Sequence, residues 1–200
     1  MCKIICVTNR KLCRGNFLER IERIASAHPY GIILREKDLE ENAYKVLAEE
    51  VKKICERNNV RCILHSFRLT AEELGTEYLH MPLPVLRQMK EKPKVNFLGV
   101  SCHSVSEVHE AVKLGADYVI AGHIFETDCK KGLSGRGLEF LHEVCGNTNV
   151  PVYAIGGISA ENANEVIGAG AEGICIMSSI MQCESPKEEI KKLRSAFDET

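Results

Sequence analysis

Short runs of apolar residues recur along the chain about every 20 to 30 residues, each followed by a polar loop and a segment with helical periodicity. Most of these runs are continuously apolar rather than alternating, which is typical of parallel strands that are covered on both faces. The pattern predicts eight strands, at Lys3–Thr8, Tyr30–Leu34, Arg61–Leu64, Tyr78–Met81, Phe97–Ser101, Tyr118–Ala121, Val152–Ile155 and Gly173–Met177.

The segments between the runs predict helices. Val46 and Val51 belong to one apolar stripe, and Ser104 followed by Glu107 is a capping-box signature. Eight strands that alternate with helices in 200 residues predict a compact (β/α)8 TIM barrel of one domain, residues 1–200. A doubly wound sheet is the alternative. The clearest helices are expected at Asn42–Glu56, Ser104–Leu114, Ser159–Ala169 and Ser185–Phe197.

Composition narrows the class of protein. The 26 basic and 28 acidic residues nearly cancel, which gives no indication of a nucleic-acid-binding surface. No apolar run approaches the ~18 residues that cross a membrane, and the first run is too short for a signal peptide. The 10 cysteines contain no C-x-x-C pair, so we interpret most of them as reduced core residues of a cytoplasmic protein without a metal site. The sequence leaves the oligomeric state open, a homo-oligomer included.

In such a barrel the functional residues lie where the strands end. Gly156 and Gly157 follow the seventh predicted strand, and Ser178 and Ser179 follow the eighth. Loops at these two places commonly bind phosphate, because their backbone N–H groups can approach an anion closely. We therefore expect all four residues to bind phosphate. His123 follows the sixth strand, where an imidazole can exchange a proton near neutral pH.

Several stretches of the chain resemble the thiamin phosphate synthase superfamily of barrels. The matching motifs are VTNR, LREKDL, GVSCHSVSE, LGADYVIAGHIFET, VYAIGGI and AGAEGICIMSSI. The loop GHIFETDCKKGLSGRG specifically resembles the TenI branch, the thiazole tautomerases. The resemblance covers most of the chain and implies a barrel that acts in thiamin biosynthesis.

Two departures from the synthase pattern separate the branches. A synthase joins hydroxymethylpyrimidine diphosphate to thiazole phosphate, with Mg²⁺ held by acidic residues after the third and fourth strands. Here these regions read LHSFRL (64–69) and HMPLP (80–84), without a carboxylate. Since Mg²⁺ needs oxygen ligands, we expect a tautomerase that uses no cofactor; Mg²⁺ is required only if the synthase alternative holds.

For a tautomerase, the resemblance implies that a carboxylated dihydrothiazole ethyl phosphate is aromatised by a proton shift. It gives His123 the role of proton shuttle. Arg35 and Lys37, after the second strand, are candidates for holding the carboxylate; an ion-pair cluster with Glu36 and Asp38 is the alternative. Further candidates at the pocket are Ser104 and Lys130 for substrate binding and the thiols of Cys102 and Cys129.

Other functions stay open beside the tautomerase. The synthase is one, and a non-catalytic regulatory barrel that binds phosphate is another. His65, after the third strand, is the second candidate for proton chemistry. The expected partner is a small phosphorylated thiazole, with no nucleic acid and no membrane.

Overall fold

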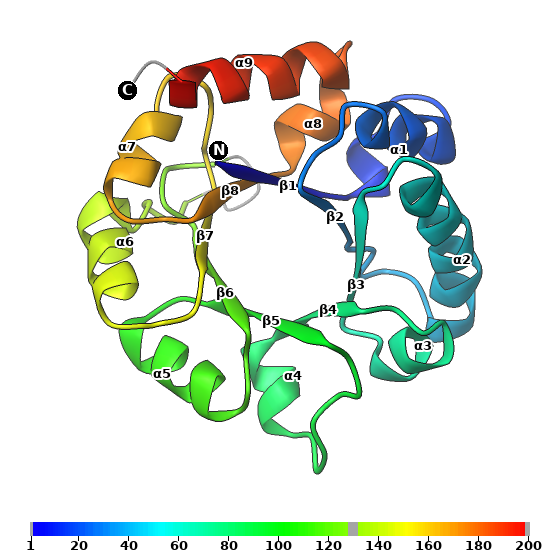
Figure 1. Cartoon of the computed structure of the whole chain (residues 1–200), viewed down its shortest axis with the longest axis horizontal. Helices are drawn as coiled ribbons and strands as arrows, with labels where there is room; N and C mark the ends of the chain where they lie inside the picture. The colour runs from blue at the N-terminus through cyan, green and yellow to red at the C-terminus, as the bar shows by residue number, and fades with distance from the viewer. Residues whose placement is uncertain (1, 128–131, 199–200) are drawn as a thin grey trace.

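Eight parallel strands close into a barrel in the computed structural model, which describes residues 2–127 and 132–198. Each strand pairs with the next one in the chain, and β1 pairs with β8 to close the ring (Figure 1). The predicted (β/α)8 TIM barrel is therefore confirmed. The strands are β1 Lys3–Val7, β2 Gly31–Leu34, β3 Arg61–His65, β4 Tyr78–Pro82, β5 Phe97–Cys102, β6 Tyr118–Gly122, β7 Val152–Ile155 and β8 Gly173–Ile176.

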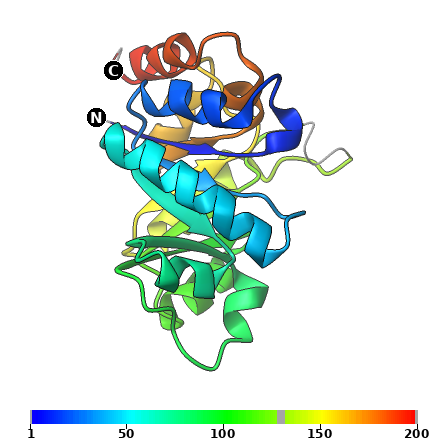
Figure 2. The same cartoon turned by 90° about the vertical axis from the view of Figure 1, so that its right-hand side faces the viewer.

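Helices surround the barrel and cover its outer face (Figure 1). Figure 2 shows α1 and α2 along one flank, where they contact each other. In the described parts of the chain, none of the helices combines the length and apolar character that crossing a membrane requires. The helices are α1 Phe17–Ala25, α2 Glu41–Arg57, α3 Arg68–Glu73, α4 Leu83–Arg87, α5 Val105–Lys113, α6 Gly137–Gly146, α7 Ala163–Gly168, α8 Ser178–Gln182 and α9 Pro186–Asp198, with a 3-10 turn η1 at Arg10–Leu12.

Both faces of the sheet are buried, which explains why its strands are continuously apolar. Alternate residues such as Ile4, Cys6 and Ile32 face the helices and belong to the main core. The remaining strand positions fill the barrel with a second buried cluster that contains Ile5, Val7, Ile33, Ile63, Tyr118, Ile120, Tyr153 and Cys175.

The predicted strands agree with the observed ones to within one residue at each end. One predicted helix is wrong at its start: Ser159 does not cap it, and α7 begins at Ala163. The reason is a local turn, in which the side chain of Asn162 accepts a hydrogen bond from the backbone N–H of Ser159 at 2.9 Å. The sequence also gave no prediction for α1, although Asn16 caps it by accepting from the N–H of Glu19.

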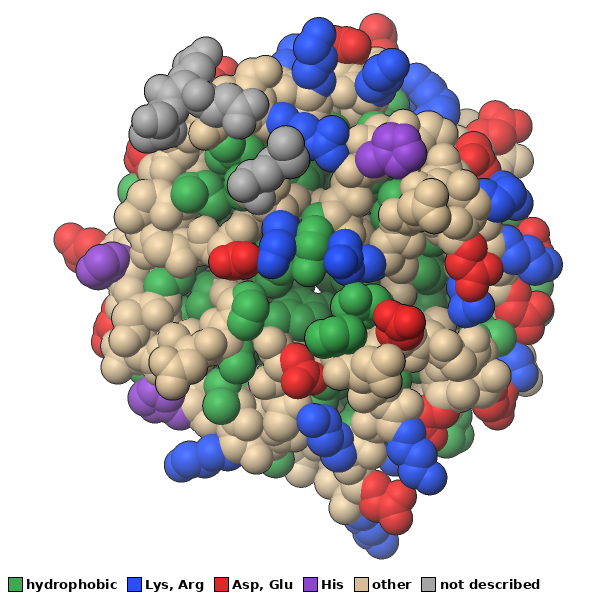
Figure 3. Space-filling view, in the orientation of Figure 1, with side chains coloured by type: hydrophobic (Ala, Val, Ile, Leu, Met, Phe, Trp, Pro, Cys, Tyr) green, Lys and Arg blue, Asp and Glu red, His purple; other side chains and the backbone are tan. Residues whose placement is uncertain are grey.

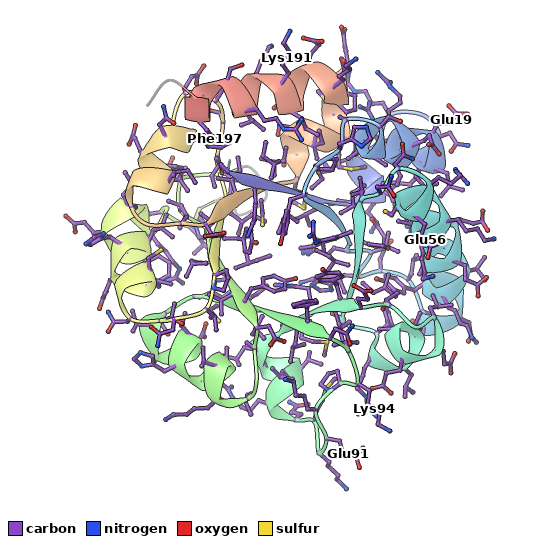
Figure 4. All side chains as sticks on the ribbon, viewed as in Figure 1. Glu19, Glu56, Glu91, Lys94, Lys191 and Phe197 are labelled. Atoms are coloured by element: carbon purple, nitrogen blue, oxygen red, sulfur yellow. The ribbon has the colours of Figure 1, made fainter. Side chains whose placement is uncertain are left out.

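Aromatic rings fill the end of the barrel where the strands begin. Tyr30 stacks on Tyr153, and the guanidinium of Arg61 lies 4.1 Å from the centre of the Tyr30 ring. Hydrophobic and charged side chains gather at the centre of the face shown in Figure 3. Labelled charged residues such as Glu19 and Glu56 point outward from the helices (Figure 4). The interior is therefore packed with side chains here, and the cavity described below lies at the other end.

Candidate active site

A cavity of about 440 Å³ lies at the C-terminal ends of the strands. Each strand, or the loop directly after it, contributes to the wall, as Val7 of β1, His65 of β3 and Ser101 of β5 illustrate. A cavity of this size suits a small molecule, and its position is the one where barrels of this type carry out their chemistry.

Most of the predicted site residues meet in this cavity. Ser104 is not among the residues that line it; the Ser104 hydroxyl accepts a hydrogen bond from the N–H of Glu107 at 3.2 Å and caps α5. Cys102 faces the helices, so the expectation that its thiol faces the pocket is wrong. Lys130 and Cys129 lie outside the described residues. The predicted residues that do line the cavity are Arg35, Lys37, His65, His123, Gly156, Gly157, Ser178 and Ser179.

His123 lies in the cavity wall directly after β6, with 6% of its surface exposed. Its Nε2 lies 3.3 Å from the carbonyl oxygen of Leu133. A carbonyl oxygen can only accept, so Nε2 carries the proton in this bond and Nδ1 of the neutral ring carries a lone pair. Within the described residues, that buried Nδ1 has no hydrogen-bond partner. In this tautomer the lone pair that can accept a proton is on Nδ1, an atom that is itself buried.

Gly156 and Gly157 turn the chain at the end of β7 with φ angles of +106° and +66°, which L side chains rarely adopt. The turn is also crowded, because a Cβ on Gly157 would lie 2.4 Å from the carbonyl oxygen of Glu126. Next to it, α8 begins at Ser178, and the first N–H groups of a helix make no bonds within that helix. Together the two segments offer backbone donors to an anion.

Arg35 and Lys37 reach the cavity from the loop after β2. Thr8 ties this loop to β1: its Oγ1 accepts from the N–H of Arg35 at 3.0 Å and donates to the carboxylate of Glu36 at 2.6 Å. Burial raises the pKa of the Glu36 carboxyl, and the hydrogen bonds from Thr8 and the Arg10 N–H partly oppose that rise. The buried carboxylate thus fixes the loop that carries two cations.

The two acidic residues of this loop, Glu36 and Asp38, have hydrogen-bond and ion-pair partners in η1. The backbone N–H of Arg10 donates to both oxygens of Glu36, at 3.1 and 3.0 Å. The Arg10 guanidinium lies 2.7 Å from Asp38, and Lys11 Nζ lies 3.2 Å from the same carboxylate. The carboxylates of Glu36 and Asp38 therefore bind groups of η1, so their interactions are not confined to the predicted ion-pair cluster with Arg35 and Lys37.

The ring of His65, in the cavity wall at the end of β3, stacks on the buried ring of His80 in the middle of β4. The centroids of His65 and His80 are 5.8 Å apart, with an angle of 30° between the rings. His80 Nε2 lies 2.8 Å from Ser101 Oγ, and its Nδ1 lies 3.3 Å from the Tyr118 hydroxyl. Burial lowers the pKa of His80 to about 3, with a further contribution from the charge of Arg35. The His80 ring is therefore neutral near pH 7.

Ser101 is one of the lining residues that the sequence did not single out. In β5, Leu98, Val100 and Cys102 face the helices. The alternation of a strand then places Ser101 on the inner side, where it lines the cavity. That alternation is the signal that identifies it, and it also assigns Cys102 to the outer face.

Mg²⁺, which the synthase alternative requires, does not fit the described donor set. The described residues that line the cavity include no Asp or Glu. Across residues 2–127 and 132–198, no three His, Cys, Asp or Glu side chains group so that they could hold a metal ion. Glu36 and Asp38 are already engaged by η1, and Mg²⁺ binds through oxygen ligands, chiefly carboxylates and phosphates.

Comparison with known proteins finds relatives over nearly the whole chain. The family model described as thiamine monophosphate synthase matches residues 4–180. A thiamine-phosphate synthase of Clostridium acetobutylicum is 33% identical over 98% of this chain and 93% of its own. The protein of that name from Coprothermobacter proteolyticus is 32% identical over 96% of this chain and 93% of its own.

Solved structures agree with the fold. Thiamine phosphate pyrophosphorylase from Pyrococcus furiosus superposes with a TM-score of 0.84 at 25% identity, and covers 98% of this chain and 96% of that one. A 3-hexulose-6-phosphate synthase has a TM-score of 0.71 at 19% identity, over 97% of this chain and 99% of that one. The second likeness concerns the barrel alone.

Proposed function

The chain belongs to the thiamine monophosphate synthase family, whose members act in thiamin biosynthesis, and we propose that within this family it is a thiazole tautomerase. Its substrate is a carboxylated dihydrothiazole with an ethyl phosphate tail. One proton leaves the ring carbon beside the carboxylate and one is added to the exocyclic carbon, so the aromatic product has the same atoms and electrons as the substrate. The likeness of the loop 122–137 to the tautomerase branch supports this choice.

The observation that carries the proposal is the hydrogen bonding of His123. Its Nε2 proton is used by the Leu133 carbonyl, and its Nδ1 lone pair has no partner among the described residues. When the His123 ring turns so that this buried Nδ1 meets the substrate, Nδ1 removes the ring proton, and the imidazolium that results returns a proton to the exocyclic carbon. A positioned acid or base of this kind contributes about 10²- to 10⁴-fold to a rate.

Charge complementarity supports the same substrate. Removing the ring proton generates negative charge that spreads into the carboxylate of the substrate. Arg35 and Lys37 line the same cavity from across the barrel, since β2 and β6 lie four strands apart around the ring, and fixed cations stabilise such charge in a site that excludes water. We assign the phosphate tail to the segments after β7 and β8, where backbone donors come from Gly156, Gly157, Ser178 and Ser179.

The second candidate is the synthase, and the names of the relatives favour it. Proteins called thiamine-phosphate synthase are 28% to 33% identical over nearly the full chain. A synthase must neutralise a diphosphate with Mg²⁺, and the described cavity wall offers this ion no carboxylate. The wall does offer a base and two cations, and for that reason the tautomerase ranks first.

A paired assay of the purified protein separates the candidates. One arm supplies the dihydrothiazole carboxylate phosphate with EDTA and follows the aromatic product by absorbance. The other arm supplies hydroxymethylpyrimidine diphosphate, thiazole phosphate and Mg²⁺, and measures pyrophosphate. The proposal expects turnover in the first arm only. Pyrophosphate release with no aromatisation would establish the synthase, and ligand binding without turnover in either arm would indicate a regulatory barrel.

The variant His123→Gln tests the assignment of the base. We expect its kcat to fall by about 10²-fold or more, while the dissociation constant for the aromatic product stays within about threefold of the wild type. Wild-type turnover by this variant would remove His123 from the mechanism. The matched control is His142→Gln, at an exposed position on α6.

A further inference from the structure

His65 lies across the barrel from the proposed phosphate loops. The strand order is cyclic from β1 to β8, so β3 lies four strands from β7 around the ring. His65 is the last residue of β3 and lines the cavity. A ligand whose phosphate is held after β7 and β8 extends its opposite end toward β3 and β4. That end therefore meets His65, with Arg35 close to it on the loop after the neighbouring strand β2.

The position of His65 is fixed from behind. Its backbone N–H donates to the Tyr44 hydroxyl at 2.9 Å, and that hydroxyl donates to the carbonyl of Leu34 at 2.7 Å. The ring stacks on His80, which is itself held between Ser101 and Tyr118. Because both backbone and ring are held, the direction of the ring nitrogens is set before a ligand arrives.

The two ring nitrogens of His65 have different surroundings. Nδ1 lies 2.7 Å from the hydroxyl of Ser66. Ser66 has a φ of +70°, an uncommon conformation for a residue other than glycine. The contact with Ser66 leaves Nε2 as the ring nitrogen available to a ligand in the cavity. Since a serine hydroxyl can either donate or accept, Ser66 keeps its bond with Nδ1 in both neutral tautomers of the ring.

The ring is neutral when the cavity is empty. Burial lowers the pKa of His65 well below its usual value, and electrostatic interactions with the neighbouring His80 ring and with the cations of Arg35 and Lys37 act in the same direction. A neutral imidazole cannot form an ion pair, but it can donate one hydrogen bond through Nε2–H. A carboxylate can only accept, so it selects this tautomer and turns the Ser66 hydroxyl into a donor toward Nδ1.

We infer that His65 is the hydrogen-bond donor that recognises the carboxylate end of the ligand, next to Arg35, and that Ser66 holds its ring for this purpose. The inference rests on the proposed function for the identity of the ligand. It makes His65 a specificity residue: it distinguishes a carboxylated thiazole phosphate from the same compound without the carboxylate.

Two substitutions of His65, by Gln and by Asn, test the roles of its two ring nitrogens separately. The amide nitrogen of a glutamine reaches the place of Nε2, whereas the amide of an asparagine reaches only the place of Nδ1. The probes are carboxythiazole phosphate and the thiazole phosphate that lacks the carboxylate, both measured by calorimetry against the full chain. We expect His65→Asn to lose about tenfold or more in affinity for the carboxylated probe only, and His65→Gln to restore most of it.

A second variant distinguishes a loss of carboxylate recognition from a loss of folding. Ser66→Ala keeps the stacking partner of the His65 ring, His80, but removes the hydroxyl that holds Nδ1, so the preference for the carboxylated probe should fall severalfold without a change in the other probe. Nitrogen-15 NMR of the histidine rings adds a direct readout: the carboxylated probe should shift His65 to the Nε2–H tautomer. Equal losses for both probes in His65→Asn, or no loss for the carboxylated one, would overturn the inference.

The outcome is distinct from a failure of the proposed function. If the wild type discriminates between the probes through His65 but does not aromatise the dihydrothiazole, carboxylate recognition stands and the tautomerase proposal fails. If turnover is present and His65→Asn binds both probes like the wild type, the tautomerase stands and the role of His65 is wrong.

Discussion

A Cβ atom on residue 156 would lie 2.4 Å from the Cβ of His123. Real side chains do not approach that closely, so Gly156 is required for the proposed base to lie where it does. The sequence suggests only that the two glycines after β7 form an anion site. The geometry adds a second reason for Gly156: it makes room for the residue that directly follows β6.

The variant Gly156→Ala is therefore expected to displace His123. The added methyl group meets His123 at a residue whose φ is +106°, and the two penalties together should lower the free energy of unfolding by about 1–3 kcal/mol. We also expect a fall in kcat of about tenfold or more, because misplacing a catalytic group by about 1 Å is costly. Urea unfolding and steady-state kinetics check this.

Gly168→Ala is the matched control. Gly168 ends α7, and nothing lies within 4 Å of the place where its Cβ would be. The kcat of Gly168→Ala should equal the wild-type value. If Gly156→Ala also kept the wild-type kcat, the packing of residue 156 against His123 would have no catalytic consequence.

A second prediction concerns Thr8, whose hydroxyl joins the N–H of Arg35 to the buried carboxylate of Glu36. Thr8→Val keeps the shape of the side chain but removes both hydrogen bonds. We expect a loss of about 1–3 kcal/mol in the free energy of unfolding, and a severalfold higher KM because Arg35 loses its anchor. Urea unfolding and kinetics with the dihydrothiazole measure the two effects.

Thr70→Val provides the comparison for Thr8. Thr70 is equally buried and its hydroxyl donates to Glu41 at 3.2 Å, but Glu41, unlike Arg35, does not line the cavity. The variant Thr70→Val should lower the free energy of unfolding without raising KM. A KM for Thr8→Val that matches the Thr70→Val value would mean that Arg35 does not depend on Thr8.

The buried histidines predict a pH dependence of stability. The pKa of His80 falls from 6.5 to about 3 on folding, and that of His65 is lowered in the same direction. Below about pH 6.5 the unfolded chain binds protons at these residues that the folded chain excludes, so the free energy of unfolding decreases as pH falls. Each histidine contributes up to about 1.4 kcal/mol per pH unit in this window.

Urea unfolding between about pH 7 and pH 5 tests this. The slope should be shallower in His80→Gln by close to one proton, and unchanged in His142→Gln, at an exposed position. Parallel curves for the wild type and His80→Gln would contradict the prediction.

The fold could be predicted because each strand is buried on both faces and therefore appears in the sequence as a continuous apolar run. Two neighbouring residues of β1 illustrate this, because Ile4 packs against the helices and Ile5 lies inside the barrel. Helix starts were less predictable. Ser159 has the residue type of a cap, but its hydroxyl accepts from the N–H of Glu161 and its own N–H donates to Asn162, so a local turn precedes α7.

The site was predictable only as far as strand ends indicate it. Ser101 and Cys102 are neighbours on opposite faces of β5, and the sequence interpretation chose the wrong one. Contacts such as that of His80 with Tyr118, 38 residues further along the chain, depend on the closed ring and have no local signature. The same holds for the Leu133 carbonyl that sets the tautomer of His123.

The last prediction concerns the Tyr44 hydroxyl, which joins the ends of β2 and β3 by donating to Leu34 and accepting from His65. In Tyr44→Phe both buried backbone groups lose their partner, so the free energy of unfolding should fall by about 2–4 kcal/mol.

Because the Tyr44 hydroxyl holds the backbone of His65 at the end of β3, the KM of Tyr44→Phe for the carboxylated substrate should also rise. Tyr78→Phe removes a hydroxyl that accepts a hydrogen bond from the exposed Arg61, at the other end of the barrel, and should change neither quantity by much. A Tyr44→Phe variant with wild-type stability and KM would show that the hydroxyl does not hold the two strands together.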